Sequence, residues 1–564
     1  MVRRRILYAV IAALLLPPLT LALLLPFVRR RFTARVLGLP PPRSGTRTLR
    51  RIAVPTADGL RLYAALFEPD RPGAYPTLII RTPYGLTVKL AWFARRFAER
   101  GYRVVAQECR GCARSDGVFD PAIHEAADGL ATIEWIRSQR WYDREAGLAM
   151  LGGSYLGYVQ WAVAAEAPAE LRALAPSITS SDFRASFWRG GALALQVMTE
   201  WMIMTEDDSG VPSLRLRASR PARALPWRHL PLRTLDEQIL GRRVDHFREW
   251  ISRPERSDPY WSARSHDERI AELTAAVQIS TRWHDLFLVE ALDDYRRLVD
   301  AGRAPILHIG PGGHTDLSAT LHGVRDDLAF LGHVFAGASL PWPTPVRVYL
   351  TGAREWLHLS EWPPPARRER LSLTADRRLV HGTSRGPADP HIGWFRYDPE
   401  DPTPSLGGAL LRGAPVVDNR ALEARADVLV YTSAPLDGDV DVVGQLALHL
   451  RVRTSERCGQ LVVRVCEVDR RGVSRNVCDG IQTFSGTREQ THSITILLGP
   501  TGHRFRAGHR LRLQIAGGAF PRFARNPGYA VAVASARRLL PVEYTLIASA
   551  ADDCALELPV FDRA

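Results

Sequence analysis

Short apolar segments alternate with longer amphipathic segments through the first part of this chain. Segments of strand length occur at 77–81 (TLIIR), 103–107 (RVVAQ) and 147–151 (GLAML), separated by stretches with helical spacing. The alternation returns at 277–281 (VQIST) and 304–310 (APILHIG). Strands alternate with helices when a parallel sheet is covered by helices on both faces. The sequence therefore predicts an α/β body.

Two regions depart from this rhythm. One is helical and rich in aromatic residues, which is typical of an insertion over a sheet edge, and the other consists of short alternating runs separated by turn residues, which is typical of a β-sandwich or jelly roll. We expect an N-terminal anchor and linker at 1–45, the first part of the body at 46–181, a helical cap at 182–267, the second part of the body at 268–362 and an all-β domain at 363–564.

The N-terminus carries an uncharged apolar run at 6–28, flanked by arginines at 3–5 and 29–31. About 20 apolar residues are enough to cross a bilayer. The run therefore predicts a single-pass membrane anchor. A cleaved signal peptide is the alternative, but no small-residue cleavage site of the A-x-A type follows the run. The side of the membrane is not readable, because arginines stand at both ends.

The formal net charge of +14 does not predict a nucleic-acid partner. The arginines are interleaved with acidic residues, and no zinc-finger spacing, phosphate-binding loop or RNA-binding sheet motif accompanies them. Six cysteines in 564 residues are too few for a disulfide scaffold. Cys109 and Cys112 form a CxxC without a second pair, so we expect loop thiols and no metal site.

The segment LGGSYLGY, at 151–158, places Ser154 where an apolar strand turns into a helix. This is the setting of a nucleophile elbow, in which small neighbours allow a tight turn that exposes the serine hydroxyl. The usual G-x-S-x-G pattern has glycine two residues after the serine, whereas here that position is Leu156 and the glycine is Gly157. The alternative is a glycine-rich loop without chemistry.

Asp285 and His314 follow the ends of the predicted strands 277–281 and 304–310. The chain order serine, acid, histidine is that of α/β-hydrolases, and the carboxyl ends of parallel strands are where such sheets place their sites. His314 is then the proton acceptor for Ser154, and Asp285 orients it. Alternatively, Asp285 is a helix cap and His314 a loop histidine. His284, beside the acid, and His308, within a strand, are weaker candidates for the base.

Tyr84 lies in the segment RTPYG, just past the predicted strand 77–81. A phenol at a strand end can donate a hydrogen bond to an oxyanion that develops during acyl transfer. The alternative is a turn aromatic with no role in a site.

Many segments of this chain resemble the cocaine-esterase-like and X-prolyl dipeptidyl-peptidase-like serine hydrolases. The resemblance extends from about residue 50 to the C-terminus and includes RTPYG, ATIEWI, GGSYLG, RWHDLF, HIGPGGH, REWLHLSEWPPP, YDPEDPTPSLGG, DNRALEARADVLVYTSAPL and RNVCDGI. It implies an α/β-hydrolase body with a helical cap and a C-terminal jelly roll. It also implies a triad of Ser154, Asp285 and His314, with the oxyanion bound by the Tyr84 hydroxyl and the Tyr155 N–H.

The chain departs from this family next to both triad partners. The family acid usually follows Gly-Trp-Tyr, but here it follows Arg-Trp-His at 282–284. The family histidine usually follows Gly-Pro-Trp-Ser, but here it follows Gly-Pro-Gly-Gly at 310–313. The loss of a tryptophan beside the base predicts a looser or larger pocket.

The residues after the acid bear on the substrate. Amino-ester hydrolases of this family carry acidic residues there to hold an ammonium group, whereas this chain has Phe287 and Leu288. This argues against an α-amino-acid substrate of that type. Aromatic residues of the predicted cap line an apolar acyl pocket or form the core of the cap: Phe183, Phe187, Trp188 and Trp201.

The sequence thus predicts a serine hydrolase that cleaves a carboxylic ester or amide of a small molecule through an acyl-enzyme. A dipeptidyl peptidase that needs a free amine and a proline before the scissile bond is the second hypothesis. A non-catalytic surface-binding protein, with the jelly roll as its binding module, is the third. No metal or organic cofactor is expected.

Overall fold

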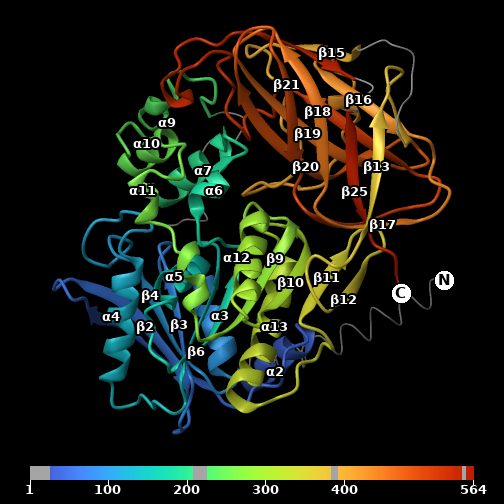
Figure 1. The fold of residues 1–564 in the computed structure, drawn as a ribbon. Helices are drawn as coiled ribbons and strands as arrows, with labels where there is room; N and C mark the ends of the chain where they lie inside the picture. Colours follow the sequence, from blue (N-terminus) through green and yellow to red (C-terminus); the bar gives the residue numbers. More distant parts are fainter. Residues whose placement is uncertain (1–25, 207–224, 383–390, 549–553, 564) are drawn as a thin grey trace, which may run out of the picture.

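The computed structural model describes residues 26–206, 225–382, 391–548 and 554–563. The N-terminal body is built on a ten-stranded sheet (Figure 1). Its strands lie side by side in the order β1 (Thr46–Pro55), β2 (Arg61–Pro69), β4 (Arg103–Glu108), β3 (Thr77–Thr82), β5 (Leu148–Gly153), β6 (Leu171–Ser177), β9 (Ala276–His284), β10 (Ile306–Gly313), β11 (Val346–Leu350) and β12 (Glu355–Leu359). The pairs from β4 to β11 are parallel, and the pairs at both edges are antiparallel.

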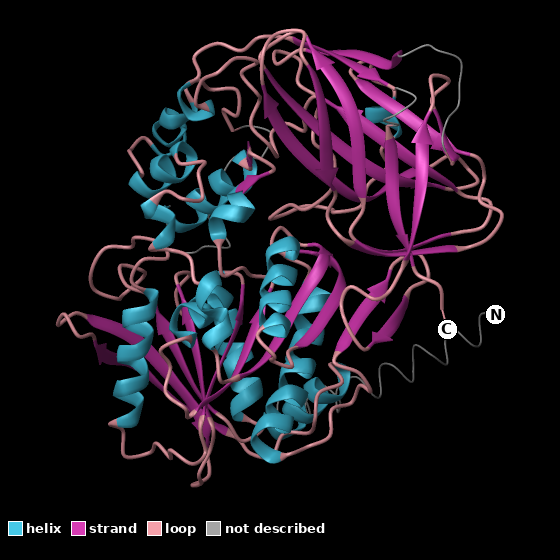
Figure 2. Cartoon of the chain, viewed as in Figure 1, coloured by secondary structure: helices cyan, strands magenta, loops and turns pink. Residues whose placement is uncertain are grey.

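Helices cover both faces of this sheet (Figure 2). Alternate residues of a strand point to opposite faces, so Ile79 of β3 joins one apolar core while its neighbours Leu78 and Ile80 join the other. The first core includes residues of α4 (Glu125–Arg137), α5 (Tyr155–Ala164) and α12 (Leu288–Asp300), and the second includes residues of α2 (Pro26–Val36), α3 (Val88–Ala98) and α13 (Leu317–Ala336). Burial on both faces explains the continuous apolar runs of the central strands.

A helical layer follows β6 and lies over the body, beside the C-terminal domain (Figure 1). It consists of α6 (Phe183–Phe187), the hairpin β7 (Trp188–Arg189) and β8 (Ala192–Leu193), α7 (Leu195–Glu206), α9 (Leu235–Leu240), α10 (Asp245–Ser252) and α11 (Pro259–Ser262). Its large aromatic side chains share one core with the first face of the sheet, so the layer packs as a cap on the body. The expected boundary at 267/268 falls inside the short 3₁₀ helix η3 (Asp267–Glu272).

The entrance to this cap is tied to the body by a buried carboxylate. Asp294 of α12 accepts hydrogen bonds from the Ser181 N–H at 3.0 Å and from the Ser181 hydroxyl at 2.6 Å. Burial is the main influence on this group, and it raises the pKa of Asp294 to about 7 although Ser181 and Arg297 oppose the shift. The carboxyl therefore holds a proton in the folded protein at pH values where an exposed aspartate is ionised.

Asp294→Asn is expected to weaken the pH dependence of stability. The pKa of this group is about 3.9 in the unfolded chain, so the stability it contributes is full below about pH 4 and is lost as pH rises through the folded value of about 7. The difference in the free energy of unfolding between variant and wild type should shift in favour of the variant by roughly 1–4 kcal/mol when the pH is raised from about 5 to about 8. Urea denaturation at both pH values measures this, and an equal gain in Asp293→Asn, the more exposed neighbour, would contradict it.

The C-terminal region is a mostly-β domain on one thirteen-stranded sheet (Figure 2). In β18 buried residues alternate with half-buried ones, as expected for a strand with one face in a core. The core of this domain is separate from the two cores of the body. The strands are β13 (Arg367–Leu373), β14 (Arg378–His381), β15 (His391–Tyr397), β16 (Val428–Ser433), β17 (Val440–Gly444), β18 (Ala447–Thr454), β19 (Cys458–Val468), β20 (Ser474–Ser485), β21 (Thr491–Leu497), β22 (Thr501–Phe505), β23 (Arg510–Ala516), β24 (Val542–Ile547) and β25 (Ala555–Val560).

The predicted anchor at 6–28 lies almost entirely outside the described residues. Only its last residues are described, and they begin α2, which packs Ala34 against the body. In the part of the chain that the structure describes, no helix has the length and apolarity needed to span a bilayer. The anchor therefore stays a prediction.

Candidate active site

Ser154 stands at the turn between β5 and α5 in a backbone conformation that is rare for a residue with a side chain, with φ 60° and ψ −128°. Its N–H donates to the Ser177 carbonyl at 2.9 Å, and its own carbonyl accepts from the Thr179 hydroxyl at 2.7 Å. Such a strained conformation persists only where the surroundings enforce it, and it is the conformation of a nucleophile elbow.

The glycines around Ser154 mark close approaches of the chain. At Gly152, where φ is 144°, a Cβ atom would lie 2.6 Å from Cβ of Leu156. At Gly157 a Cβ atom would lie 2.5 Å from Cγ2 of Thr179. The tight contact between α5 and the loop after β6 thus falls at Gly157, three residues after the serine. This explains why glycine stands at 157.

Ser154, His314 and Asp285 come together from the ends of three parallel strands, β5, β10 and β9. His314 Nε2 lies 3.1 Å from Ser154 Oγ, and His314 Nδ1 lies 2.6 Å from Asp285 Oδ2. The other carboxylate oxygen accepts from the Phe287 N–H at 2.8 Å. With its Nδ1–H donated to Asp285, the imidazole presents the unprotonated Nε2 to the serine hydroxyl. The side chains of His314 and Asp285 are buried.

Arg282 explains one departure from the family pattern. Its Nη1 donates to three carbonyls of the loop that carries the histidine, those of Gly313 at 2.8 Å, His314 at 3.1 Å and Asp316 at 3.3 Å. The guanidinium is buried, and burial lowers its pKa from the ordinary value. A buried cation that binds three carbonyls holds this loop against β9.

The two competing histidines lie elsewhere in the fold. His284 lies near Asp479 of the C-terminal domain, and burial lowers its pKa to about 4. His308 packs edge-on against Trp342 with ring centroids 4.6 Å apart, and burial lowers its pKa well below the ordinary value. Among the described residues, neither forms a hydrogen bond with Ser154, whereas His314 does.

Two further groups that can donate hydrogen bonds lie close to Ser154, the Tyr84 hydroxyl and the Tyr155 N–H. The Tyr84 hydroxyl is within hydrogen-bonding reach of the Ser154 side chain, and it accepts the indole N–H of Trp201 at 3.1 Å. Burial raises the pKa of Tyr84 to about 12, so the hydroxyl keeps its proton at neutral pH. Tyr155 is the first residue of α5, and the first N–H groups of a helix have no acceptor within the helix and favour negative charge.

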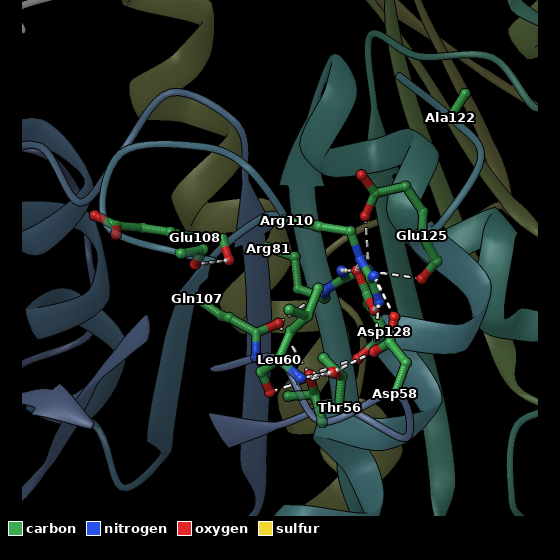
Figure 3. A network of polar contacts seen from close by, with 12 residues as sticks. Thr56, Asp58, Leu60, Arg81, Gln107, Glu108, Arg110, Ala122, Glu125 and Asp128 are labelled. Atoms are coloured by element: carbon green, nitrogen blue, oxygen red, sulfur yellow. Dashed lines mark hydrogen bonds and ion pairs between the residues drawn. The ribbon is translucent and has the colours of Figure 1, made fainter. Parts of the chain in front are cut away.

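A buried ion pair lies beneath these donors. The Tyr155 hydroxyl donates to Glu125 Oε1 at 2.8 Å, and Arg81 Nη1 lies 2.9 Å from Glu125 Oε2. Figure 3 shows Arg81 beside Glu125 and Gln107. The side-chain oxygen of Gln107 accepts from Arg81 Nε at 2.9 Å. Arg81 is on β3, three residues before Tyr84, and Glu125 is the first residue of α4, so the ion pair joins β3 to α4 and the Tyr155 hydroxyl links α5 to it.

An apolar pocket of about 340 Å³, including its open mouth, leads to the serine. Of the cap aromatics predicted to line it, three do so, whereas Trp188 does not: its indole N–H donates to the Trp250 carbonyl at 2.9 Å and its ring packs within the cap. The lining residues are Ser154, Tyr155, Phe183, Phe187, Val197, Trp201, Trp250, Leu286, Phe287 and Leu411.

Sequence reasoning missed several of these lining residues. Trp250 stacks on Trp201 with ring centroids 5.3 Å apart and on Phe187 at 4.8 Å. Its only sequence signal is the helical spacing of apolar residues in DHFREWIS, which indicates burial and not a pocket. Leu411 comes from a connection of the C-terminal domain, far from the serine in sequence, and carries no signal at all.

Potential metal ligands and the two CxxC thiols were the other candidates for a reactive site in the described part of the chain. Within the described residues, no three His, Cys, Asp or Glu side chains are placed to hold a metal ion. Cys109 and Cys112 are buried and unpaired, and burial raises the pKa of both thiols. Because the thiolate is the nucleophilic form, these cysteines are not set up as nucleophiles.

A nucleophile elbow in a mostly parallel sheet, below a helical cap and beside a mostly-β domain, defines the chain as an α/β-hydrolase. The sequence model of X-Pro dipeptidyl-peptidase (S15 family) matches residues 58–316, and that of the X-Pro dipeptidyl-peptidase C-terminal non-catalytic domain matches residues 342–534. The chain belongs to the X-Pro dipeptidyl-peptidase S15 family, and is a serine hydrolase of the esterase or dipeptidyl-peptidase type.

Several relatives are similar over most of their length. The cocaine esterase of Rhodococcus sp. is 29% identical over 534 residues, which cover 84% of this chain and 91% of the esterase. A putative serine esterase of Mycobacterium tuberculosis is 24% identical with the same coverage. Among solved structures, an α-amino acid ester hydrolase superposes with a TM-score of 0.79 at 19% identity, over 92% of this chain and 97% of that one. A CocE/NonD family hydrolase of Staphylococcus aureus gives 0.69 at 17% identity with the same coverage. At these identities, the two structures show that the fold is shared.

Proposed function

We propose that this protein is an acyl esterase, which hydrolyses carboxylic esters with an uncharged, apolar acyl group. The observation that carries the proposal is the contact of His314 with both Ser154, at 3.1 Å, and Asp285, at 2.6 Å, at the end of an apolar pocket. An acyl chain buried against aromatic walls leaves water and gains stabilisation in proportion to its apolar area.

In the reaction, Ser154 Oγ attacks the ester carbonyl carbon while its proton passes to His314 Nε2. Asp285 stabilises the imidazolium that forms. The tetrahedral intermediate collapses, and the leaving alcohol takes the proton from His314. Water then attacks the acyl-serine, His314 takes a proton from that water and returns it to Ser154 Oγ, and the carboxylic acid leaves.

The oxyanion of each tetrahedral intermediate is bound by the Tyr84 hydroxyl and the Tyr155 N–H. The Trp201 indole donates to the Tyr84 oxygen, so the phenolic proton stays available for the oxyanion. A donor fixed before the reaction begins requires no reorganisation as the charge develops.

Tyr84→Phe is expected to lower kcat/KM for an ester substrate by about 100–1000-fold, because one oxyanion donor is lost while the ring remains. Steady-state kinetics measures the loss, and circular dichroism checks the fold. Tyr75→Phe is a matched control, since that hydroxyl makes an exposed hydrogen bond to the Arg71 carbonyl. Retention of more than about a third of the activity in Tyr84→Phe would remove Tyr84 from the site.

A dipeptidyl peptidase is the second candidate, supported by the family description. Such an enzyme must hold the free amine of its substrate, and a buried amine requires a paired charge. Among the described residues that line the pocket, none is acidic. The lining therefore favours the esterase.

Parallel assays of p-nitrophenyl esters and X-Pro-p-nitroanilides decide between the two. We expect turnover of the esters, rising with acyl chain length until the pocket is filled, and none of the anilides. Turnover of the anilides without the esters would reverse the assignment, and turnover of neither would refute both.

We further propose that residues 6–28 anchor the enzyme to a membrane. The support is the uncharged run between two arginine groups. Fractionation of cells should place the full chain with the membranes and a chain lacking residues 1–25 in the soluble fraction. Recovery of the full chain in the soluble fraction, with its N-terminus intact, would contradict the anchor.

A further inference from the structure

A second cavity lies beside the pocket of Ser154. The two share a wall of three aliphatic side chains, Val197, Leu286 and Leu411. These come from the cap, the body and the C-terminal domain respectively, so the second cavity opens where the three parts of the protein meet. Unlike its neighbour, it is lined by several polar side chains.

The shared wall stands on the acid–base side of the serine. Leu286 directly follows Asp285, and the Leu411 carbonyl accepts from the hydroxyl of Thr315, the residue after His314, at 3.3 Å. In ester cleavage the leaving oxygen takes its proton from the histidine, so the leaving group must occupy this side. The second cavity is therefore placed to receive a substituent of the leaving group.

Arg189 supplies one polar wall of the cavity. Its Nη2 donates to the Leu286 carbonyl at 3.1 Å and to the Glu290 carboxylate at 2.9 and 3.0 Å. Among the described residues, these are all the hydrogen bonds of the Arg189 side chain. The N–H groups of Nε and Nη1 therefore remain available to donate to a ligand. Arg189 lines the cavity and Glu290 does not, so the pair presents its positive member to the space.

Arg522 supplies a second guanidinium. It binds Asp479 through two hydrogen bonds of 2.6 and 2.9 Å, and Arg464 pairs with the same carboxylate at 3.1 Å. Two guanidinium groups share one carboxylate, and this leaves an excess of one positive charge. Arg522 lines the cavity, whereas Asp479 does not.

Ser186 adds a buried hydroxyl without a partner. The residue is 4% exposed and lines the cavity. Its Oγ has no hydrogen bond among the described residues. Buried polar atoms in native structures nearly always have a partner, so this hydroxyl indicates a ligand atom or a water in the cavity.

Together these observations point to a second subsite, and we infer that it binds a carboxylate carried by the leaving group of the substrate. The inference rests on the proposed esterase activity and goes further by naming the leaving group. Two guanidinium groups and a hydroxyl are donors that a carboxylate accepts, and no acidic side chain among the described lining residues opposes it. The preferred substrate is an ester with an apolar acyl part and an anionic alcohol or phenol part.

The test compares two esters with the same hexanoyl group, 3-(hexanoyloxy)benzoate and 3-(hexanoyloxy)benzamide. Each kcat/KM is divided by the rate of alkaline hydrolysis of the same ester, which removes the difference in leaving-group reactivity. Wild type is expected to prefer the benzoate by about tenfold or more, as expected for a charge-assisted hydrogen bond. A preference of less than about twofold would overturn the subsite.

Substitutions in the second cavity test whether its residues cause the preference for the benzoate ester. Ser186→Ala should reduce it several-fold, and the double variant Arg189→Gln with Glu290→Gln, which removes both charges of the pair, should abolish it. Arg243→Gln is the matched control, because that arginine of the cap is exposed and its one ion pair with a described residue is with Asp245. Equal preferences in wild type, Ser186→Ala and the double variant would place the carboxylate elsewhere and overturn the inference.

Calorimetry separates this inference from the esterase proposal. The product analogue 3-hydroxybenzoate should bind to Ser154→Ala more tightly than 3-hydroxybenzamide does, whether or not either ester is hydrolysed. Hydrolysis of neither ester, together with selective binding of the benzoate, would refute the esterase and support the subsite. Ester hydrolysis without selective binding would support the esterase and refute the subsite.

Discussion

Ser154→Ala is expected to lower kcat for ester hydrolysis by about 10⁵–10⁶-fold, the largest effect of any substitution proposed for this protein. In the proposed mechanism the hydroxyl forms the covalent bond to the acyl group, and alanine offers no atom in its place. The strained backbone at Ser154 is held by Ser177 and Thr179 through main-chain contacts, so the variant keeps the elbow and its fold. Steady-state kinetics with a p-nitrophenyl ester measures the loss.

Covalent labelling gives a second readout of the same substitution. A fluorophosphonate should label wild type and leave Ser154→Ala unlabelled. Ser138→Ala and Cys109→Ala serve as controls, the first an exposed serine and the second a buried thiol. Labelling that survives in Ser154→Ala would transfer the nucleophile to another residue. Labelling of neither protein would favour a non-catalytic binding protein.

Asp285→Asn is expected to lower kcat by about 10⁴-fold with little change in fold. Asparagine can keep an oxygen toward the Phe287 N–H, which places its amide –NH₂ toward His314 Nδ1. The imidazole must then accept at Nδ1 and carry its proton on Nε2, facing Ser154. In that tautomer it cannot take the serine proton.

This variant also tests the simplest rival role for Asp285, that of a helix cap. Asparagine caps helices about as well as aspartate does, so a residue that acted only as a cap would tolerate the exchange. The measurement is kcat together with the thermal midpoint. Asp300→Asn is the matched control, because Asp300 is an exposed aspartate at the end of α12, the helix that follows Asp285. A loss of less than about tenfold would make Asp285 a structural residue.

The strands that carry the site could be predicted because their signals are local. The run TLIIR became β3 and GLAML entered β5, each buried on both faces as its continuous apolar pattern indicates. The elbow at Ser154 was readable for the same reason, since a strand, two glycines and a helix follow one another within a few residues. The N-terminal run is the one large feature that no described residue tests.

The pocket could not be predicted in this way, because its walls come from segments that meet only after folding. Trp188 and Trp201 look alike in sequence, yet the indole of one bonds to the Trp250 carbonyl within the cap while that of the other bonds to Tyr84 at the site. Arg282 reads as a departure from a family pattern until the structure shows the three carbonyls it gathers.

By itself, then, the sequence of this protein determined the class of sheet and the turn at Ser154, and it predicted the chain order of Ser154, Asp285 and His314. Each of these depends on the spacing of neighbours along the chain. The tertiary structure alone decided which aromatic residues line the pocket beside Ser154, what supports the loop that carries His314, and that Arg189 and Ser186 border a second cavity. These depend on contacts between residues far apart in sequence, whose packing is set by the whole core.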